Sequence, residues 1–477
     1  MHAQCVAAHV IGGHFLPYAR TQKEGAGVSG SGSGSSVMLL SASLHRRWYA
    51  PGDVVRAEVC LHGLPNPPGS TSNVASVRIG RVDNYFADVD ADALPVARVK
   101  SLMAQIVGVC AVDSRRLQYA LAEERAAAER CRRLVDDKLS KDYNVYRLFC
   151  SDAVYLASNL PLRERESRAL VVTFTLPDYL PPSFRGQCIR FYYALHLSGV
   201  RCGPRELSAP VKLCIPIKVY SAQAILTPLL LSASFPLDGF DFRPNVVIRQ
   251  SAPSPALTGP LQSTLAPAEV EDFDARVLPN RALHARTNQL ARQRTPLEFP
   301  LSLEGELALT VALASTTVMI GDSLNGIFVV KDNSTFQPVK VLGSLEFLEC
   351  CSAKHVKSGV SCHPLPGWGK ELVVAETRVV EEFEWVVLDR ASARFSVSLT
   401  NPNIYSSMHT DVVTSCWQLR LRFLWCRSSV LRQCRATHCE ELKIEEEEPE
   451  LVVPLIVVPP FQCEQLPCKG ATLQVLC

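Results

Sequence analysis

The sequence predicts an all-β protein of two tandem antiparallel β-sandwich domains, with a helical insertion in the first domain. Between residues 171 and 220, three segments alternate apolar and polar side chains with a period of two, which is typical of half-buried strands. Pro, Asp and Gly separate these segments, as turns require. The three apolar sets are Val172, Phe174 and Leu176; Ile189, Phe191, Tyr193, Leu195 and Leu197; and Val211, Leu213, Ile215, Ile217 and Val219.

The same segments recur near the C-terminus in the same order, and this repetition is the second observation. The third segment carries a proline in the same slot each time, Pro216 and Pro454. Because proline cannot donate to a strand ladder, it belongs on an edge strand or at a bulge. Recurrence of the whole set predicts two homologous all-β domains rather than a short solenoid repeat. The matching stretches are 50–61 with 319–330, 172–176 with 395–399, 188–197 with 416–425, and 213–219 with 451–457.

The repeats and the composition divide the chain into folded and unfolded parts. Ranges rich in Gly and Ser, in Pro and Ala, or in Glu bury too little apolar surface to fold, and we expect them to be disordered. The predicted division is a disordered Gly/Ser-rich N-terminus at 1–36, a first sandwich at 37–222, a largely disordered linker at 223–300 that is least ordered at 250–275, a second sandwich at 301–460 with an acidic loop at 440–450, and a tail at 461–477.

Two features of the first domain stand apart from the repeat. Ala50-Pro51-Gly52-Asp53 suits a type II turn, so we expect strands on both sides of it, at 44–48 and 55–61. The range 84–150 breaks the period of two, and Arg115–Leu139 within it is rich in Ala, Leu, Glu and Arg, which favour helices. We expect a helical insertion that packs against its own domain, with partner binding as the alternative.

Composition narrows the function classes. The 477 residues are 47% hydrophobic and carry a net charge of +2, which gives no general attraction to nucleic acid or membrane. The 18 cysteines are scattered without a CxxC pair, as expected of buried thiols in a reducing, cytosolic compartment. The longest uncharged run, 219–237, contains two prolines, so we expect no membrane-spanning helix. Any membrane contact should be peripheral, and the arginines of 276–294 fit a solvated linker better than a lipid-binding patch.

The motifs that resemble catalytic or metal sites lack their structural context. Gly25–Gly30 fits GxGxxG but lies in a Gly/Ser tract without a preceding strand. Gly321–Leu324 spells GDSL, an esterase signature, but the chain has no DxxH to supply a base, and the repeat gives Ser323 the slot of Val54. We therefore predict no catalytic, cofactor-binding or metal site. The residues considered for zinc, which lack CxxC-like pairing, are Cys350, Cys351, Cys362, His363, Cys434, His438 and Cys439.

The most specific phrase in the chain is Pro181-Pro182-Ser183-Phe184-Arg185-Gly186-Gln187, which leads into the strand that starts at Ile189. Tandem β-sandwiches that each open with a Gly-Asp turn and close with the three-strand phrase resemble the arrestin fold. The PPSFRGQ segment resembles more narrowly the Rgp family, the arrestin-like subunit of the Ric–Rgp complex. The resemblance covers about 40–60 and 170–220 in the first domain, and 310–350 and 395–458 in the second.

This resemblance implies a function in membrane trafficking. The Ric–Rgp complex is a guanine nucleotide exchange factor for a Golgi Rab GTPase in retrograde, endosome-to-Golgi vesicle transport. A member of this family would be a non-catalytic subunit, cytoplasmic and peripheral on the Golgi membrane. Its partners would be a large Ric-like subunit and the Rab GTPase, without nucleic acid or cofactor, and PPSFRGQ would be structural or partner-binding. The alternative is an arrestin-like cargo adaptor of the retromer or α-arrestin type, which would bind receptor tails.

Overall fold

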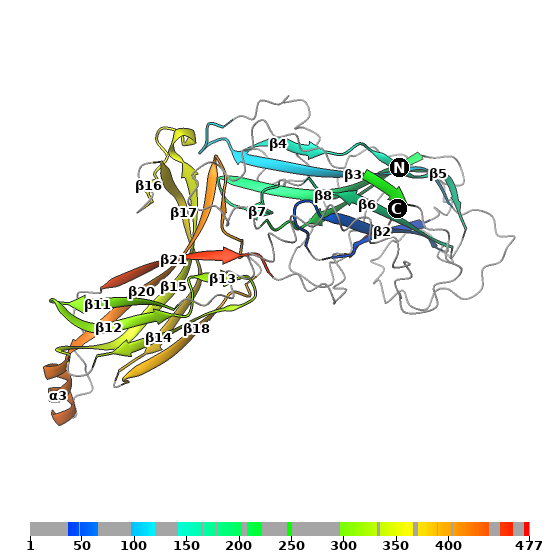
Figure 1. Cartoon of the computed structure of the whole chain (residues 1–477). Coiled ribbons are helices and arrows are strands. Elements are labelled where there is room, and N and C mark those ends of the chain that lie inside the picture. Colours follow the sequence, from blue (N-terminus) through cyan, green and yellow to red (C-terminus); the bar gives the residue numbers. More distant parts are fainter. Residues whose placement is uncertain are drawn as a thin grey trace, which may run out of the picture.

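The computed structural model describes most of the two expected sandwiches, and nearly all of the described chain is β-strand. The two sandwiches lie end to end in an elongated molecule (Figure 1). Antiparallel sheets dominate both, which confirms the predicted fold class. The described residues are 37–64 except 47, 97–119, 142–221 except 164–165, 178–179 and 203–207, 246–249, 296–437 except 332–333, 366–370, 389 and 402–403, 449–460, and 472–476.

The first sandwich consists of two antiparallel sheets. One has the strand order β10-β6-β2-β1-β22. In the other, β3 pairs with β8 along one side and with β4 and β5 on the other, while β7 and β9 pair with β8. The strands are β1 (Val37–Leu44), β2 (Val54–Leu64), β3 (Ala97–Asp113), β4 (Tyr143–Cys150), β5 (Val154–Leu162), β6 (Ser167–Thr175), β7 (Phe184–Arg185), β8 (Ile189–Cys202), β9 (Ser208–Ile217), β10 (Val246–Arg249) and β22 (Thr472–Leu476).

The second sandwich repeats this plan. One sheet has the order β11-β12-β14-β18, and the other has the order β13-β21-β20-β15-β17-β16, with β19 also paired to β20. The helix α3 (Ser428–Thr437) follows β20 at the end of the molecule distant from the first sandwich (Figure 1). The remaining elements are β11 (Leu297–Leu303), β12 (Glu306–Leu313), β13 (Thr317–Met319), β14 (Ser323–Val330), β15 (Phe336–Ser352), the 3-10 helix η4 (Ala353–His355), β16 (His363–Pro364), β17 (Leu372–Val386), β18 (Ser392–Ser398), β19 (Met408–His409), β20 (Val413–Arg427) and β21 (Glu450–Val458).

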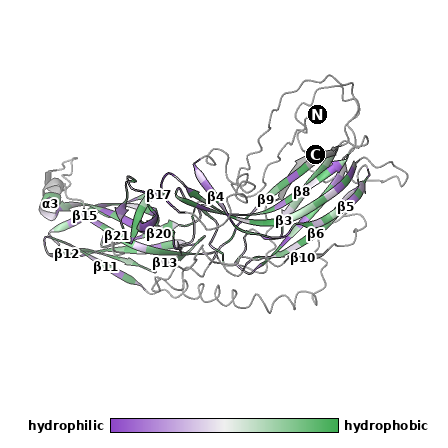
Figure 2. Ribbon diagram, turned by 90° about the horizontal axis from the view of Figure 1, so that it is seen from above, coloured by the Kyte–Doolittle hydropathy of each residue, from purple (hydrophilic) through white to green (hydrophobic). Residues whose placement is uncertain are grey.

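The apolar side chains predicted to face inward are buried. Phe191 and Tyr193 of β8 are 1% and 2% exposed, and Leu419 and Phe423 of β20 are completely buried. All four belong to one continuous core that runs through both sandwiches. Hydrophobic and hydrophilic residues alternate along the strands in Figure 2, as the period of two in the sequence requires.

The repeated Gly-Asp phrase forms the same turn in both sandwiches. Gly52 and Gly321 have positive φ angles of 80° and 98°, which favour glycine. The N–H of Gly52 donates to the Pro177 carbonyl and the N–H of Gly321 donates to the Leu399 carbonyl, and both bonds are 3.0 Å long. The sequence match at this phrase therefore reflects a shared backbone conformation and shared strand contacts.

Two predictions for the first domain are wrong in part. In the described portions of the range 84–150, the chain forms the strands β3 and β4, and 114–119 form a turn and a bridge instead of the start of a helix. β3 is a strand because it pairs along almost its whole length with β8. Most of the helix predicted within that range, 120–139, lies outside the described residues. The first strand ends at Leu44 instead of spanning 44–48, because the chain bends at His45 and Arg46, where the Arg46 N–H donates to the Tyr49 hydroxyl (3.1 Å).

Two ranges predicted to lie outside the sandwiches contribute strands to the first one. The linker supplies β10, which pairs with β6, and the tail supplies β22, which pairs with β1. Both strands complete an edge of the same sheet, where unpaired N–H and C=O groups favour an added strand. The ranges 1–36, 250–275 and 440–448 lie outside the described residues.

Candidate functional site

The segment singled out in the sequence, 181–187, lies where the two sandwiches meet. Pro181 and Pro182 lack N–H groups, so Ser183 is the first residue of the segment that can donate from its backbone. Its N–H donates to the Val219 carbonyl (2.8 Å), and its hydroxyl accepts from the Val219 N–H (2.8 Å). The Pro181 carbonyl accepts from the buried Tyr193 hydroxyl (2.7 Å). These bonds hold the segment against the first sandwich.

Phe184 carries the apolar contact between the sandwiches. Its side chain is buried, and its ring lies 5.9 Å from the ring of Phe347 and 5.3 Å from that of Tyr405, both in the second sandwich. Phe191 lies behind it in the first sandwich, with a ring separation of 6.5 Å. Aromatic rings at these separations attract one another beyond the effect of burial alone. Phe184 therefore joins the cores of the two domains.

Glu349 of β15 makes the central polar contact from the second sandwich. Its carboxylate accepts three backbone N–H bonds from the first sandwich: from Gln187 (2.6 Å), Cys188 (3.0 Å) and Ile189 (3.1 Å). A Cβ on Gly186 would lie 2.3 Å from a Glu349 carboxylate oxygen, so only glycine permits this approach. A carboxylate in the core thus completes the hydrogen bonding of a turn in the other domain.

The pKa of Glu349 reflects two opposing effects. The pKa is raised from 4.5 to about 7, chiefly because complete burial disfavours the charged form, and the nearby carboxylate of Glu376 adds a smaller contribution in the same direction. The three N–H bonds lower the pKa because they favour the charged form. The carboxyl group therefore exchanges its proton near neutral pH while it lies between the domains.

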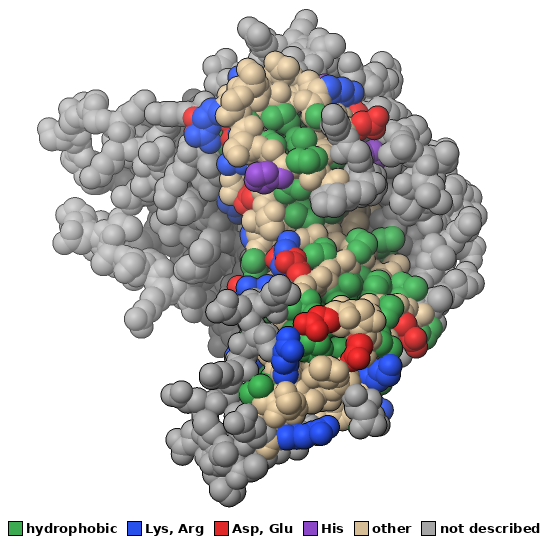
Figure 3. Space-filling model, turned by 90° about the vertical axis from the view of Figure 1, so that its left-hand side faces the viewer, with side chains coloured by type: hydrophobic (Ala, Val, Ile, Leu, Met, Phe, Trp, Pro, Cys, Tyr) green, Lys and Arg blue, Asp and Glu red, His purple; other side chains and the backbone are tan. Residues whose placement is uncertain are grey.

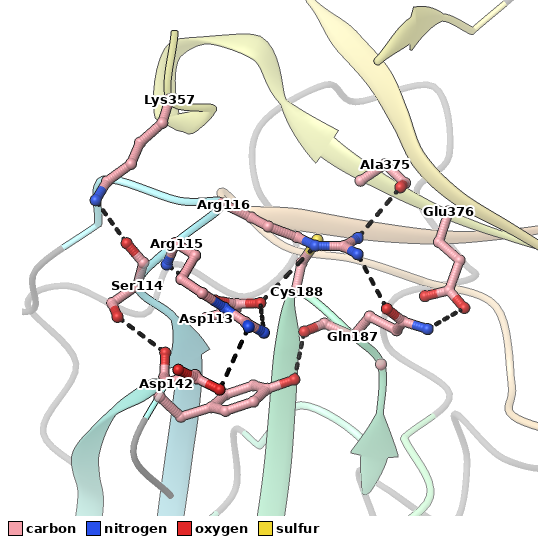
Figure 4. A network of polar contacts seen from close by, with 12 residues as sticks. Asp113, Ser114, Arg115, Arg116, Asp142, Gln187, Cys188, Lys357, Ala375 and Glu376 are labelled. Carbon is pink, nitrogen blue, oxygen red and sulfur yellow. Dashed lines mark hydrogen bonds and ion pairs between the residues drawn. The ribbon is translucent and has the colours of Figure 1, made fainter. Parts of the chain in front are cut away.

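Gln187 connects this centre to a second polar network (Figure 4). Its side-chain oxygen accepts from the Arg116 guanidinium (3.1 Å), and its side-chain nitrogen donates to Glu376 (2.7 Å). Its backbone carbonyl accepts from the Tyr143 hydroxyl (2.5 Å). Arg116, which follows β3, also donates to the carbonyl of Ala375 on β17 (3.4 Å). Its guanidinium therefore bonds to one residue of each sandwich.

A third set of contacts joins the end of β3 to the turn after η4. The Lys357 ammonium donates to the Ser114 carbonyl (2.5 Å), and its backbone N–H donates to the Arg116 carbonyl (2.9 Å). Leu117 and Val356 form an antiparallel bridge across the junction. The side of the junction that carries Lys357 and Arg116 is drawn in Figure 4. Backbone pairing of this kind fixes the relative orientation of two domains more firmly than side-chain contacts alone.

The residues of PPSFRGQ all lie at the junction between the sandwiches, but they differ in how far they are buried. Pro181, Pro182, Phe184 and Gly186 are buried, whereas Arg185 and Gln187 are exposed. Ser183 and Gln187 carry the polar bonds described above. The segment is therefore structural at its centre and presents two polar side chains at the surface.

The partners of the segment in the second sandwich were not predicted from the sequence. One signal was present: Glu346 and Glu349 interrupt the otherwise apolar run of β15, and both are buried in the structure. A carboxylate in such a run is expected to have a specific partner. Glu346 finds its partners within the second sandwich, in Gln418 (2.7 Å) and Arg420 (2.8 Å), and Glu349 finds them across the junction.

Of the alternative motifs, Gly25–Gly30 and the zinc candidates His438 and Cys439 lie outside the described residues. Ser323 of the GDSL phrase starts β14 and pairs in register with Ser398. Within the described residues, no group of three or more His, Cys, Asp or Glu side chains is placed to hold a metal ion. Nor is any helix in that part of the chain long and apolar enough to cross a membrane.

Comparison of the sequence with protein-family models and with curated proteins finds no match.

Proposed function

We propose that this chain is a non-catalytic subunit of a guanine nucleotide exchange complex that activates a Golgi Rab GTPase in retrograde vesicle transport. In this proposal it acts in the cytoplasm, peripherally on the Golgi membrane, bound to a large Ric-like subunit. Nucleotide exchange requires a surface that distorts the phosphate and magnesium site of the GTPase, and it requires no nucleophile. A two-domain scaffold suits that task.

One observation carries the proposal: the PPSFRGQ segment, on which the resemblance to the Rgp family rests, is the segment around which the junction is built. Phe184, Gly186 and Gln187 each contact the second sandwich. A junction of this kind holds two binding surfaces at a fixed distance and angle. Such a scaffold would present the GTPase to its partner subunit in one orientation, which lowers the entropic cost of assembling three proteins.

The test is release of a fluorescent nucleotide from a panel of Rab GTPases. The reactions contain this chain alone, the large Ric-like partner alone, or both. We expect release above background from a Golgi Rab only when both proteins are present. Equal release with and without this chain would exclude it from the exchange machinery, and capture of receptor-tail peptides by the isolated chain would support the cargo-adaptor alternative instead.

A pair of variants connects this test to the junction. Glu349→Gln alters the contact between the sandwiches, while Glu346→Gln alters a carboxylate that is also buried on β15 but bonds within the second sandwich. We expect Glu349→Gln to slow exchange by the complex several-fold and Glu346→Gln to leave it nearly unchanged. Similar losses in both variants would mean that the orientation of the two domains is irrelevant to exchange.

A further inference from the structure

β17 is the edge strand of the larger sheet in the second sandwich over most of its length. One side pairs with β15, from Leu372 to Val386. On the other side, only Val373 and Val374 have a strand partner among the described residues, in β16. The Ala375 carbonyl accepts from Arg116; beyond it, no described strand pairs with the row of backbone N–H and C=O groups on this side. Such a row is a template for an added strand.

The last six residues of β17 form the regular part of this edge. The register with β15 shifts between Val379 and Glu381, which marks a bulge, and from Glu381 to Val386 the pairing runs without interruption. Bulges break the pairing of an incoming strand as well as that of the existing one. The stretch 381–386, which we call the acidic edge, is therefore the part of β17 able to accept a partner strand.

The side chains of the acidic edge have two different faces. Glu382, Glu384 and Val386 are exposed on the outer face, whereas Phe383 and Trp385 are half-buried. The ring of Trp385 lies 4.9 Å from Phe395 of the opposite sheet, so the inner face of the edge continues the aromatic core. Figure 3, which views the molecule from the end where the second sandwich lies, shows apolar side chains with acidic ones set among them.

The charge on the outer face is only partly neutralised within the chain. Lys340 of β15 forms an ion pair with Glu384 (2.7 Å). Glu382, on the same outer face, has no ion-pair partner among the described residues. A strand placed beside this edge would bring its own side chains about 5 Å from these carboxylates on one face and from the aromatic rings on the other.

We propose that the acidic edge binds an extended segment of another protein in which apolar residues alternate with lysine or arginine. The segment adds one strand to the sheet. Its basic side chains lie beside Glu382 and Glu384, and its apolar side chains cover the exposed flank of Phe383 and Trp385. Backbone bonds supply affinity, and the alternation of charge and apolar surface selects the partner. The inference rests on the fold of the second sandwich and is independent of the proposed function.

The first experiment measures binding of a synthetic nine-residue peptide, alternating Val and Arg and carrying a fluorescent label, to the full chain by fluorescence anisotropy. We expect saturable binding that weakens at least tenfold in the double variant Glu382→Lys/Glu384→Lys. The matched control is Glu298→Lys, on the exposed part of β11 in the opposite sheet, which should bind as the unaltered chain does. Equal weakening by the control would reduce the effect to net charge and overturn the proposal.

N-methylated peptides separate strand pairing from charge attraction. In an added strand, alternate N–H groups face the edge, so N-methylation of one alternate set should abolish binding while methylation of the other set is tolerated. A peptide with Glu in place of Arg should not bind. Equal binding by both methylated peptides overturns the proposal, and so does a lack of binding by the unmethylated peptide and both methylated ones. If none of these peptides binds, the glutamates serve only to keep copies of the chain from pairing through this edge.

The folded state of the variants is verified independently. Circular dichroism and the melting temperature of the double variant should match those of the unaltered chain, because both glutamates are exposed. A second pair, Glu382→Gln/Glu384→Gln, removes charge without reversing it and should weaken binding less than the lysine pair. A graded loss in this order supports electrostatic recognition, and an equal loss in both pairs contradicts it.

Discussion

The two sandwiches fill the same position in the sheet with strands from very different parts of the chain. In the second sandwich the strand beside β12 is β11, which precedes it across the two-residue turn Glu304-Gly305, both with positive φ. In the first sandwich the strand beside β1 is β22, from the C-terminus. A hairpin closes a loop of two residues, whereas β1 and β22 close almost the whole chain, which costs more entropy.

The comparison extends to the opposite edges of the sheets. The first sandwich receives β10 from the interdomain linker beside β6. In the second sandwich the corresponding strand is β18, the last strand of its sheet, which has no strand partner on its outer side among the described residues. The first sandwich is thus completed by strands from outside its own repeat, and the second is built from its own residues. Two domains built on the same plan need not have equal autonomy, because the edge strands decide which of them depends on the rest of the chain.

A shared packing device shows how closely the interiors still correspond. In each larger sheet a glycine on the central strand faces a phenylalanine on the neighbouring strand. A Cβ on Gly108 would lie 2.3 Å from the Phe149 ring, and a Cβ on Gly343 would lie 1.7 Å from the Phe383 ring. Ring-over-glycine contacts of this kind leave no room for a side chain. The interiors of the two domains therefore correspond more closely than their edges do.

The largest expected effect tests whether the two cores are equivalent. Phe191→Ala and Phe423→Ala each remove a buried ring, from the first and the second sandwich. Each should lower the free energy of unfolding by about 3–5 kcal/mol. Urea unfolding followed by tryptophan fluorescence measures the loss. The exposed controls are Tyr155→Ala and Val386→Ala, at 64% and 57% exposure, and they should change stability by less than about 0.5 kcal/mol.

Unequal losses of unfolding free energy in Phe191→Ala and Phe423→Ala would mean that the two cores are not equivalent. A loss below about 1 kcal/mol in one of the two phenylalanine variants would mean that its strand face is inverted relative to the core. If both variants unfold in a single transition, the junction couples the sandwiches thermodynamically. Two separate transitions, of which only one shifts in each variant, would show that the domains unfold independently.

The fold was predictable from the sequence because it depends on local patterns, and the junction was not because it depends on distant pairs. Alternation identified β8 and β20 and their inner faces, and the Gly-Asp turns identified the repeat. Nothing local in β15 specifies that Glu349 binds the turn at Gln187. The strands β10 and β22 were missed for the same reason, since an edge strand is defined by the neighbour it pairs with.

The second prediction concerns how the stability of the protein depends on pH through Glu349, the carboxyl group at the junction of the two sandwiches. The folded-state pKa of Glu349 is raised from 4.5 to about 7. A raised pKa means that the folded state binds the proton more tightly than the unfolded state does, so protonation favours folding. The contribution of Glu349 to stability is therefore largest below about pH 4.5, falls as the pH rises toward 7, and stays constant above it.

Urea unfolding at pH 5, 6, 7 and 8 measures this effect. Between pH 5 and pH 8 we expect the unaltered chain to lose at most about 2–3 kcal/mol through this group. Glu349→Gln should remove that dependence, whereas Glu346→Gln should retain it. The same slope in Glu349→Gln as in the unaltered chain would assign the pH dependence to other groups. The groups whose charge acts on Glu349, or that feel its charge, are Glu376, Tyr143, Cys350 and Cys351.

The smallest expected effect distinguishes the two sandwiches most directly. Deletion of residues 461–477 removes β22 and leaves the edge of β1 without its partner. Because β22 is short and its pairing closes a long loop, we expect a loss of only about 1 kcal/mol, confined to the first sandwich. Hydrogen exchange followed by mass spectrometry should show faster exchange in β1, with β12 and β14 unchanged.

The control for this deletion comes from the local strand that fills the same position. Gly305 has a φ of 86° in the turn between β11 and β12, so Gly305→Val introduces strain there. Faster exchange should then appear in β12 and not in β1. If the deletion of 461–477 accelerates exchange in both sandwiches equally, β22 stabilises the whole molecule through the junction. The difference between β22, which comes from the C-terminus, and β11, which is adjacent in sequence to its partner, would then affect the order of folding and not the stability of separate domains.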